Sequence, residues 1–202
     1  MLGGGRRRIV IKSIMSKQSN NLYICISSDL NFLLLKAINY KRDALKIKND
    51  DYGECSDGFH MLTTVSLELF LKTLVAINAV KKFNDPNISS AIFVDTISKS
   101  ISKYGHKIDL LFQDLQELYT VLEINKVSVE KHLFAREYVL EFKTGVAIIK
   151  DLEGLRYGSF ARHQDKSTIC FLDKNIVYLL DALEEYVMEQ FKLLLTDKQR
   201  LS

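Results

Sequence analysis

Residues that break regular structure are scarce in this sequence. The 202 residues include one proline, Pro86, and nine glycines. Because a many-turned β fold needs proline or glycine at frequent turns, this composition favours long helices. A hydrophobic content of 47% is enough for one substantial core at this chain length. We therefore predict a single all-α domain, an up-and-down antiparallel helical bundle.

Charge and cysteine content limit which partners and which kinds of stabilising site this sequence can have. With 28 basic and 25 acidic residues, the formal charge is +3, so a nucleic-acid partner must be held by a local patch. The three cysteines, Cys25, Cys55 and Cys170, are odd in number and far apart, which predicts neither a disulfide framework nor a zinc site. The apolar window 22–38 is interrupted by polar residues and is unsuited to span a membrane. We expect a soluble, cytoplasmic protein without a membrane partner.

The first residues have a different composition from the remainder. Three glycines and three arginines stand together in "MLGGGRRR", and no long apolar segment or small-residue cleavage site follows them. We predict that residues 1–20 are a disordered basic tail and that residues 21–200 form the single domain. A translated leader ahead of an internal start at Met15 is a further hypothesis for the first 14 residues.

Helical periodicity predicts the order of elements. The segment 59–80 is the most apolar, and the segment 108–122 has the clearest one-sided pattern. The pattern drifts in the segment 128–150, where a strand-like excursion after Gly145 is an alternative, and the segment 151–168 has the composition of a loop. The predicted helices cover residues 29–48, 59–80, 88–103, 108–122, 128–150 and 173–195.

A line of polar residues runs along the apolar segment 59–80. Its members are spaced four apart and so share one helix face: His60, Thr64, Glu68 and Lys72. One interpretation is an exposed stripe with a surface ion pair of a few tenths of a kcal/mol. The other is that Glu68 and Lys72 are partly buried and hold a partner from another element, because buried charges are rarely unpaired. Both interpretations stay open at this point.

The segment "YGHKIDLLFQDL", residues 104–115, is the second notable stretch. Gly105 can supply a left-handed turn, and His106 precedes a predicted helix whose first-turn amides it could cap. Asp109 falls in the first turn, where a carboxylate suits the helix dipole. A helix start explains this stretch, and a functional His106 is the alternative.

The sequence lacks the motifs of several enzyme classes. The sequence contains no G-x-x-x-x-G-K-[ST] loop, no H-E-x-x-H pair, no acidic calcium loop and no G-x-S-x-G elbow. We therefore expect no metal site and no cofactor.

The two notable stretches together resemble the HEPN superfamily, the higher eukaryotes and prokaryotes nucleotide-binding domain. The resemblance rests on "LELFLK", then "GHKIDLLF", and later "LRYG", and covers about residues 57–195. It implies a helical bundle that is frequently dimeric. Active members are metal-independent RNases, many from toxin–antitoxin or phage-defence systems, and some pair with small nucleotidyltransferases.

The superfamily's nuclease signature is an Arg followed after four to six residues by a His. Here Arg156 and His163 are separated by six residues, although Tyr157 stands where a polar residue is usual. The resemblance implies that Arg156 stabilises the pentavalent phosphate and His163 takes the 2′-hydroxyl proton, with Arg162 and Tyr157 as substrate contacts. The alternative is architectural, with Arg156 anchoring its loop to Glu68.

Two function classes follow. The first is a protein that binds or acts on RNA or a nucleotide, with metal-independent endoribonuclease activity as its enzymatic form. The second is a non-catalytic helical interaction module that works as a homodimer with a partner protein, such as an antitoxin or a nucleotidyltransferase.

Overall fold

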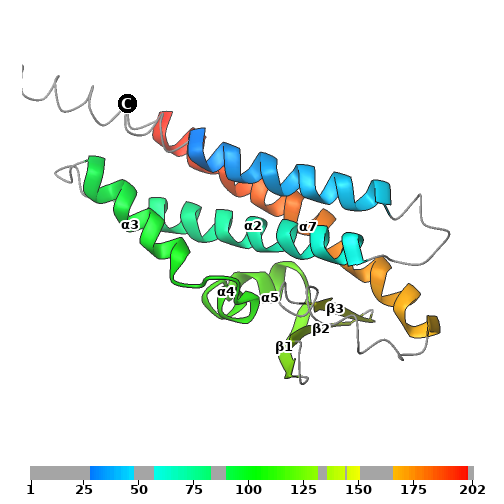
Figure 1. Ribbon diagram of the computed structural model, residues 1–202. Coiled ribbons are helices and arrows are strands. Elements are labelled where there is room, and N and C mark those ends of the chain that lie inside the picture. Colours follow the sequence, from blue (N-terminus) through cyan, green and yellow to red (C-terminus); the bar gives the residue numbers. More distant parts are fainter. Residues whose placement is uncertain are drawn as a thin grey trace, which may run out of the picture.

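The computed structural model of the chain describes residues 28–47, 57–82, 90–131, 136–143, 145–150 and 166–199. Three long helices form one layer, and short helices with a small sheet lie beneath it (Figure 1). The long helices are residues 28–47, α2 (Asp57–Lys82) and α7 (Lys166–Gln199). The predicted helices 29–48 and 59–80 are confirmed, and the predicted helix 173–195 lies within the longer α7.

Beside the shared apolar core, polar contacts join the helix over 28–47 to the other two long helices. The hydroxyl of Ser66 in α2 donates to the carbonyl of Ala37 at 2.8 Å. The ammonium of Lys41 lies 2.6 Å from Glu184 of α7 and also pairs with Asp181. The helix over 28–47 therefore contacts both α2 and α7, which also pack against each other.

Helix α2 is the centre of the structure. Among the described residues, Gly58–Lys82 is one helix long and apolar enough to cross a membrane by length and composition, and 72% of its most apolar window is buried inside the fold. A mostly buried apolar helix is what the core of a soluble protein contains, and the finding is consistent with a soluble protein.

Three shorter helices follow α2 in the chain. α3 spans Ser90–Ser102, α4 spans Ile108–Asp114 and α5 spans Glu117–Val121. The helix predicted over 88–103 is confirmed, and Gly105 takes the predicted left-handed conformation with φ +54°. The continuous helix predicted over 108–122 is wrong, since it divides at Leu115–Gln116. The apolar residues on both sides of the break stay buried, so the one-sided pattern predicted burial but not continuity.

The prediction of an all-α fold is wrong, because the segment predicted as a helix over 128–150 is a sheet. β1 (Ile124–Lys131), β2 (Arg136–Phe142) and β3 (Gly145–Lys150) form an antiparallel meander in the order β1-β2-β3. The fold is therefore mixed α/β. The strand-like excursion after Gly145 is real, but it is one strand of three.

Burial of side chains explains why this segment is a sheet. On β3, Ala147 and Ile149 are buried between partly exposed neighbours, with a period of two that suits a strand, and on β2 Tyr138, Val139 and Leu140 are all buried. Leu140 pairs with Ala147 across the two strands. β-branched residues are frequent here, and they pack well on a pleated surface. Burial of this face against the rest of the fold thus favours strands over a helix, although the segment has few turn-forming residues.

The sheet docks onto the long helices through β3. The hydroxyl of Thr64 in α2 donates to the carbonyl of Lys150 at 2.8 Å, and the amide of Asn175 in α7 donates to the carbonyl of Val146 at 2.8 Å. Gly145 leaves room for this approach, because an added Cβ would lie 2.8 Å from the Asn175 amide nitrogen. Side chains from both helices therefore cover the free edge of β3.

Both α2 and α7 begin beside the sheet and run in the same direction (Figure 1). Far from the sheet, Lys81 of α2 donates to Gln190 of α7 at 2.7 Å. The predicted up-and-down antiparallel order is therefore also wrong. The intervening short helices and sheet return the chain to the starting end of α2, so α7 repeats its direction.

Candidate functional site

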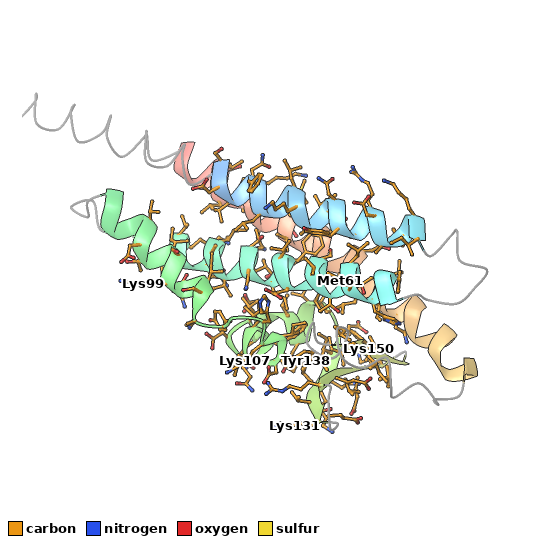
Figure 2. The ribbon with its side chains drawn as sticks, viewed as in Figure 1. Met61, Lys99, Lys107, Lys131, Tyr138 and Lys150 are labelled. Carbon is orange, nitrogen blue, oxygen red and sulfur yellow. The ribbon has the colours of Figure 1, made fainter. Side chains whose placement is uncertain are left out.

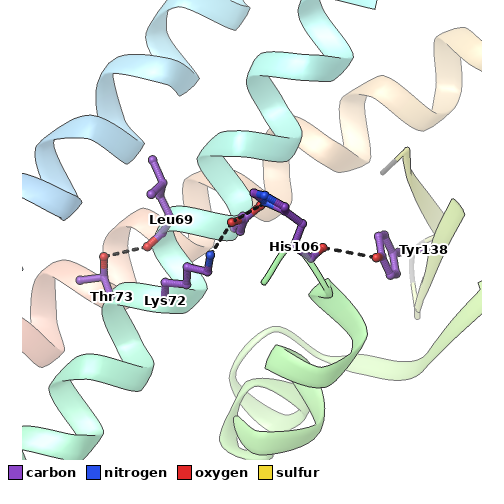
Figure 3. Close-up of polar contacts among 6 residues, drawn as sticks. Leu69, Lys72, Thr73, His106 and Tyr138 are labelled. Atoms are coloured by element: carbon purple, nitrogen blue, oxygen red, sulfur yellow. Dashed lines mark hydrogen bonds and ion pairs between the residues drawn. The ribbon is translucent and has the colours of Figure 1, made fainter. Parts of the chain in front are cut away.

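His106, in the loop that precedes α4, lies against α2 (Figure 3). Its partner there is the carboxylate of Glu68. Glu68 is only 6% exposed although it belongs to an otherwise apolar helix. Its Oε1 accepts a hydrogen bond from Lys72 Nζ at 2.6 Å, and the two oxygens lie 3.1 and 2.9 Å from Nδ1 of His106. The interpretation of an exposed polar stripe is therefore wrong, and the buried carboxylate holds a partner from another element.

The remainder of the polar stripe also faces inward. His60 and Thr64 are buried, and Thr64 binds β3 through the carbonyl of Lys150. From Thr64 to Lys72, the stripe therefore follows the seam between α2 and the layer beneath it. This explains why polar residues occur at a four-residue interval in an apolar helix: they satisfy groups on the sheet and the α3–α4 loop.

The ionised carboxylate determines the hydrogen-bonding state of His106. A carboxylate can only accept, so the imidazole must donate through Nδ1–H. The His106 side chain is 71% exposed although its partner is 7% exposed. The ring edge with Nε2 therefore faces solvent, and within the described part of the chain Nε2 has no hydrogen-bond partner. The result is an accessible imidazole oriented from behind by a buried carboxylate.

The loop that carries His106 is closed by a second polar cluster. The Tyr104 hydroxyl donates to Asp114 at the end of α4, and Lys103 Nζ lies 3.0 Å from the same carboxylate. The hydrogen bond from Tyr104, together with Lys103, holds the pKa of Asp114 below its usual value. Burial and the Asp114 contact raise the pKa of Tyr104, which therefore stays protonated as the donor. This cluster joins the start of the loop that carries His106 to the last residue of α4.

The helix start after His106 differs from the predicted cap. Lys107 takes the N-cap position of α4, with no side-chain capping hydrogen bond, while the His106 ring lies against Glu68. Capping by His106 is therefore wrong, and Asp109 does lie in the first turn. The Tyr138 hydroxyl of β2 makes a long hydrogen bond of 3.4 Å to the His106 carbonyl (Figure 3).

The structure thus brings Glu68, Lys72 and His106 together. The predicted nuclease residues all fall outside the described residues: Arg156, Tyr157, Arg162 and His163. The proposed partner of Glu68, Arg156, is among them, so that pairing stays a prediction. Among the described residues, the partners of Glu68 are Lys72 and His106.

Sequence reasoning missed three residues that position the site. Tyr104 and Asp114 are ten apart and belong to different elements, so no helical spacing relates them. Tyr138 falls in the segment predicted as a helix, which concealed its place on a strand that faces the loop. One available signal was the position of Tyr104 directly before the Gly105-His106 turn, where a buried aromatic can fix a loop.

Comparison of the chain with family models, with curated proteins and with solved structures finds no match in any of the three. The resemblance to the HEPN superfamily therefore stays a prediction. Within the described ranges, no three His, Cys, Asp or Glu side chains gather as metal ligands would.

The arrangement has a definite chemical capacity. A carboxylate on Nδ1 fixes the tautomer and orientation of an imidazole, leaving Nε2 to exchange a proton with a bound molecule. Lys72 adds a positive charge beside it, and the exposed Lys107 adds another below α2 (Figure 2). The site combines a proton-transfer group with cations that suit an anionic ligand.

We predict that Glu68→Ala destabilises the protein by roughly 3 to 5 kcal/mol, because it leaves the Lys72 ammonium in a mostly buried position without its partner. Asp95→Ala is the matched control, since Asp95 also precedes a lysine by four residues but is 56% exposed. That control should change the free energy of unfolding by no more than about 0.5 kcal/mol. Chemical denaturation measures both, and equal unfolding midpoints for Glu68→Ala and the parent would contradict the prediction.

A second prediction concerns the pH dependence of stability. Because the pKa of Asp114 is lower in the folded state, its stabilising contribution is complete above the unfolded-state pKa of about 3.9 and is lost as pH falls through the folded pKa. The difference in unfolding free energy between the parent and Asp114→Asn should therefore be constant above pH ~5 and shrink toward pH ~3. Denaturation curves at several pH values measure it. A difference that stays constant over this range would refute the assignment.

Proposed function

We propose that this chain is a HEPN-like, RNA-directed protein of the cytoplasm that cleaves RNA without a metal ion. One observation carries the proposal. The stretches "LELFLK" and "GHKIDLLF", whose combination underlies the resemblance, meet through the bond between Glu68 and His106. A contact between the motifs gives a physical reason for them to occur together, since one supplies a buried carboxylate and the other its imidazole partner.

Cleavage of RNA without a metal ion needs few protein groups. Metal-free cleavage needs a base for the 2′-hydroxyl proton, a cation for the pentavalent phosphate and a group that protonates the leaving oxygen. Under the proposal, His163 is the base and Arg156 the cation, with Arg162 and Tyr157 contacting the RNA.

A homodimer is the expected assembly, in a toxin–antitoxin or defence system with an antitoxin or nucleotidyltransferase as partner. The sheet between α5 and α7 is an addition to the helical layer.

The test is cleavage of a mixed pool of transfer and messenger RNA with EDTA present. The parent should cleave it, and His163→Ala should lose most of that activity while keeping its circular-dichroism spectrum and melting temperature. Removal of a proton-transfer group typically costs about 10²- to 10⁴-fold in rate. His132→Ala is the control, because no motif includes this histidine. Equal cleavage by His163→Ala and the parent would remove His163 from the site, and a parent that neither binds nor cleaves RNA would overturn the proposal.

A different observation supports the second function, an interaction module. Phe32 and Leu35 on the helix over 28–47 are 58% and 49% exposed, and they lie three residues apart on one face. Lys36 Nζ covers the Phe32 ring at 4.5 Å from its centroid. Exposed large apolar side chains that share a helix face are typical of a contact with another chain.

If this face forms a homodimer, Phe32→Ser with Leu35→Ser should shift the mass measured by light scattering from dimer to monomer. Leu193→Ser on α7, an exposed apolar residue of a different helix, is the control. A parent that is monomeric at all concentrations would exclude this face as a dimer contact.

A further inference from the structure

The two edges of the sheet differ. Thr64 of α2 and Asn175 of α7 bind carbonyl groups of β3 and cover its edge. β1 is the outermost strand on the other side of the sheet, away from the long helices (Figure 1). α4 and α5 contact β1, but in the described part of the chain its backbone is hydrogen-bonded to β2 and to no other segment.

An edge strand presents every second backbone N–H and C=O to the outside, where they can pair with a further strand. Proteins commonly protect such an edge by keeping the strand very short or by placing proline in it. β1 has neither protection, since it is eight residues long and contains no proline. The edge of β1 is therefore a surface to which a further strand can add.

The residues at the centre of β1 are arranged symmetrically about Ser128. Lys126 and Glu130 lie two positions to either side of it and are exposed. Val127 and Val129 are its direct neighbours, and both pack against the core. Because side chains alternate along a strand, the charged residues and the valines are on opposite faces of the sheet.

We propose that the edge of β1 binds a second copy of this chain, with the two β1 strands antiparallel and related by a two-fold axis at Ser128. Ser128 then lies opposite its own copy, and the two sheets form one continuous sheet. This pairing rests on the homodimer of the proposed function and assigns it to the sheet rather than to the helix over 28–47.

The side chains of the two copies are complementary in this arrangement. Each Lys126 lies opposite Glu130 of the second copy, on the solvent face. Each Val127 lies opposite Val129 of the second copy, on the face that packs against the core. A two-fold axis repeats both contacts, and cross-strand pairs of opposite charge and of apolar residues stabilise a sheet.

The charges also select this register. A register centred on Lys126 would place two lysines opposite each other, and one centred on Glu130 would place two glutamates opposite each other, which is unfavourable. Registers centred on either valine leave Lys126 and Glu130 without an opposite charge across the new edge. Within the segment 126–130, pairing about Ser128 is therefore the register in which the charges attract.

The first experiment is a cysteine cross-link at the proposed axis. In a chain whose three native cysteines are replaced by serine, Ser128→Cys places a thiol opposite its own copy. Opposite residues of antiparallel strands have Cα atoms about 4.5 to 5.5 Å apart, a distance that a disulfide bridges. Lys126→Cys is the matched control, because its own copy is four strand positions away, about 14 Å, and beyond that reach. Under mild oxidation, Ser128→Cys should form covalent dimers and Lys126→Cys should not.

The second experiment tests the register by charge reversal. Because one strand edge is a small contact, we expect a weak dimer whose dissociation constant equilibrium sedimentation can measure. Lys126→Glu and Glu130→Lys should each raise that constant about tenfold, since like charges then face each other twice across the axis. The double variant restores opposite charges and should return the constant to within about threefold of the parent.

Two controls separate dimerisation from folding. Lys192→Glu makes the same charge change at an exposed position of α7 and should leave the dissociation constant unchanged. The melting temperature of each variant reports any effect within one protomer, including loss of the ion pair between Lys126 and Glu141. Rescue by the double variant does not restore that ion pair, so it reports the contact between copies.

Three results would overturn this assignment. They are a parent that is monomeric at every concentration, equal cross-linking of Ser128→Cys and Lys126→Cys, and a dimer that Phe32→Ser with Leu35→Ser abolishes but neither charge reversal weakens. RNA cleavage by the parent is measured separately. A monomeric parent that cleaves RNA leaves the RNA-directed function standing, whereas a dimer formed through β1 that neither binds nor cleaves RNA overturns that function alone.

Discussion

Much of this structure depends on one buried carboxylate. Transfer of Glu68 into the interior is costly unless its oxygens are hydrogen-bonded, and Lys72 and His106 supply those bonds at 2.6 to 3.1 Å. Lys72 belongs to the same helix, so among the described partners of Glu68 it is His106 that comes from a different part of the fold. Because His106 lies in the loop between α3 and α4, the requirement to pair this charge joins that loop to α2, beside the core contacts of α4 and the sheet.

The need to pair the buried Glu68 carboxylate also gives this junction a chemically reactive group. An apolar pair at this junction would pack the layers equally well but would leave nothing reactive at the surface. The hydrogen bond between Glu68 and His106 instead places an oriented imidazole at the boundary with solvent, and the contact of Tyr104 with Asp114 holds the loop that carries it. The hydrogen bond between Glu68 and His106 thus serves both stability and proton transfer. Substitutions of either residue therefore need a folding measurement as well as a chemical one.

Much of the helical layer was predictable, because apolar residues with a 3.6-residue period report which face is buried. The sheet was not: its short segments lack proline and the common turn pairs, and tertiary burial of Tyr138 and Leu140 decided the outcome. The four-residue polar stripe correctly drew attention to Glu68. Its partner could not be inferred, because the contact with His106 spans 38 positions and no periodicity encodes such a distance. Arg156 and His163 lie outside the described residues and stay predictions.

The most direct test of the central claim is the coupling energy between Glu68 and His106. Unfolding free energies of the parent, Glu68→Gln, His106→Ala and the double variant form a double-mutant cycle. If the buried carboxylate joins the two layers through this imidazole, the two substitutions should be non-additive by roughly 1 to 3 kcal/mol. Additive effects, with a coupling energy within about 0.3 kcal/mol of zero, would contradict the claim.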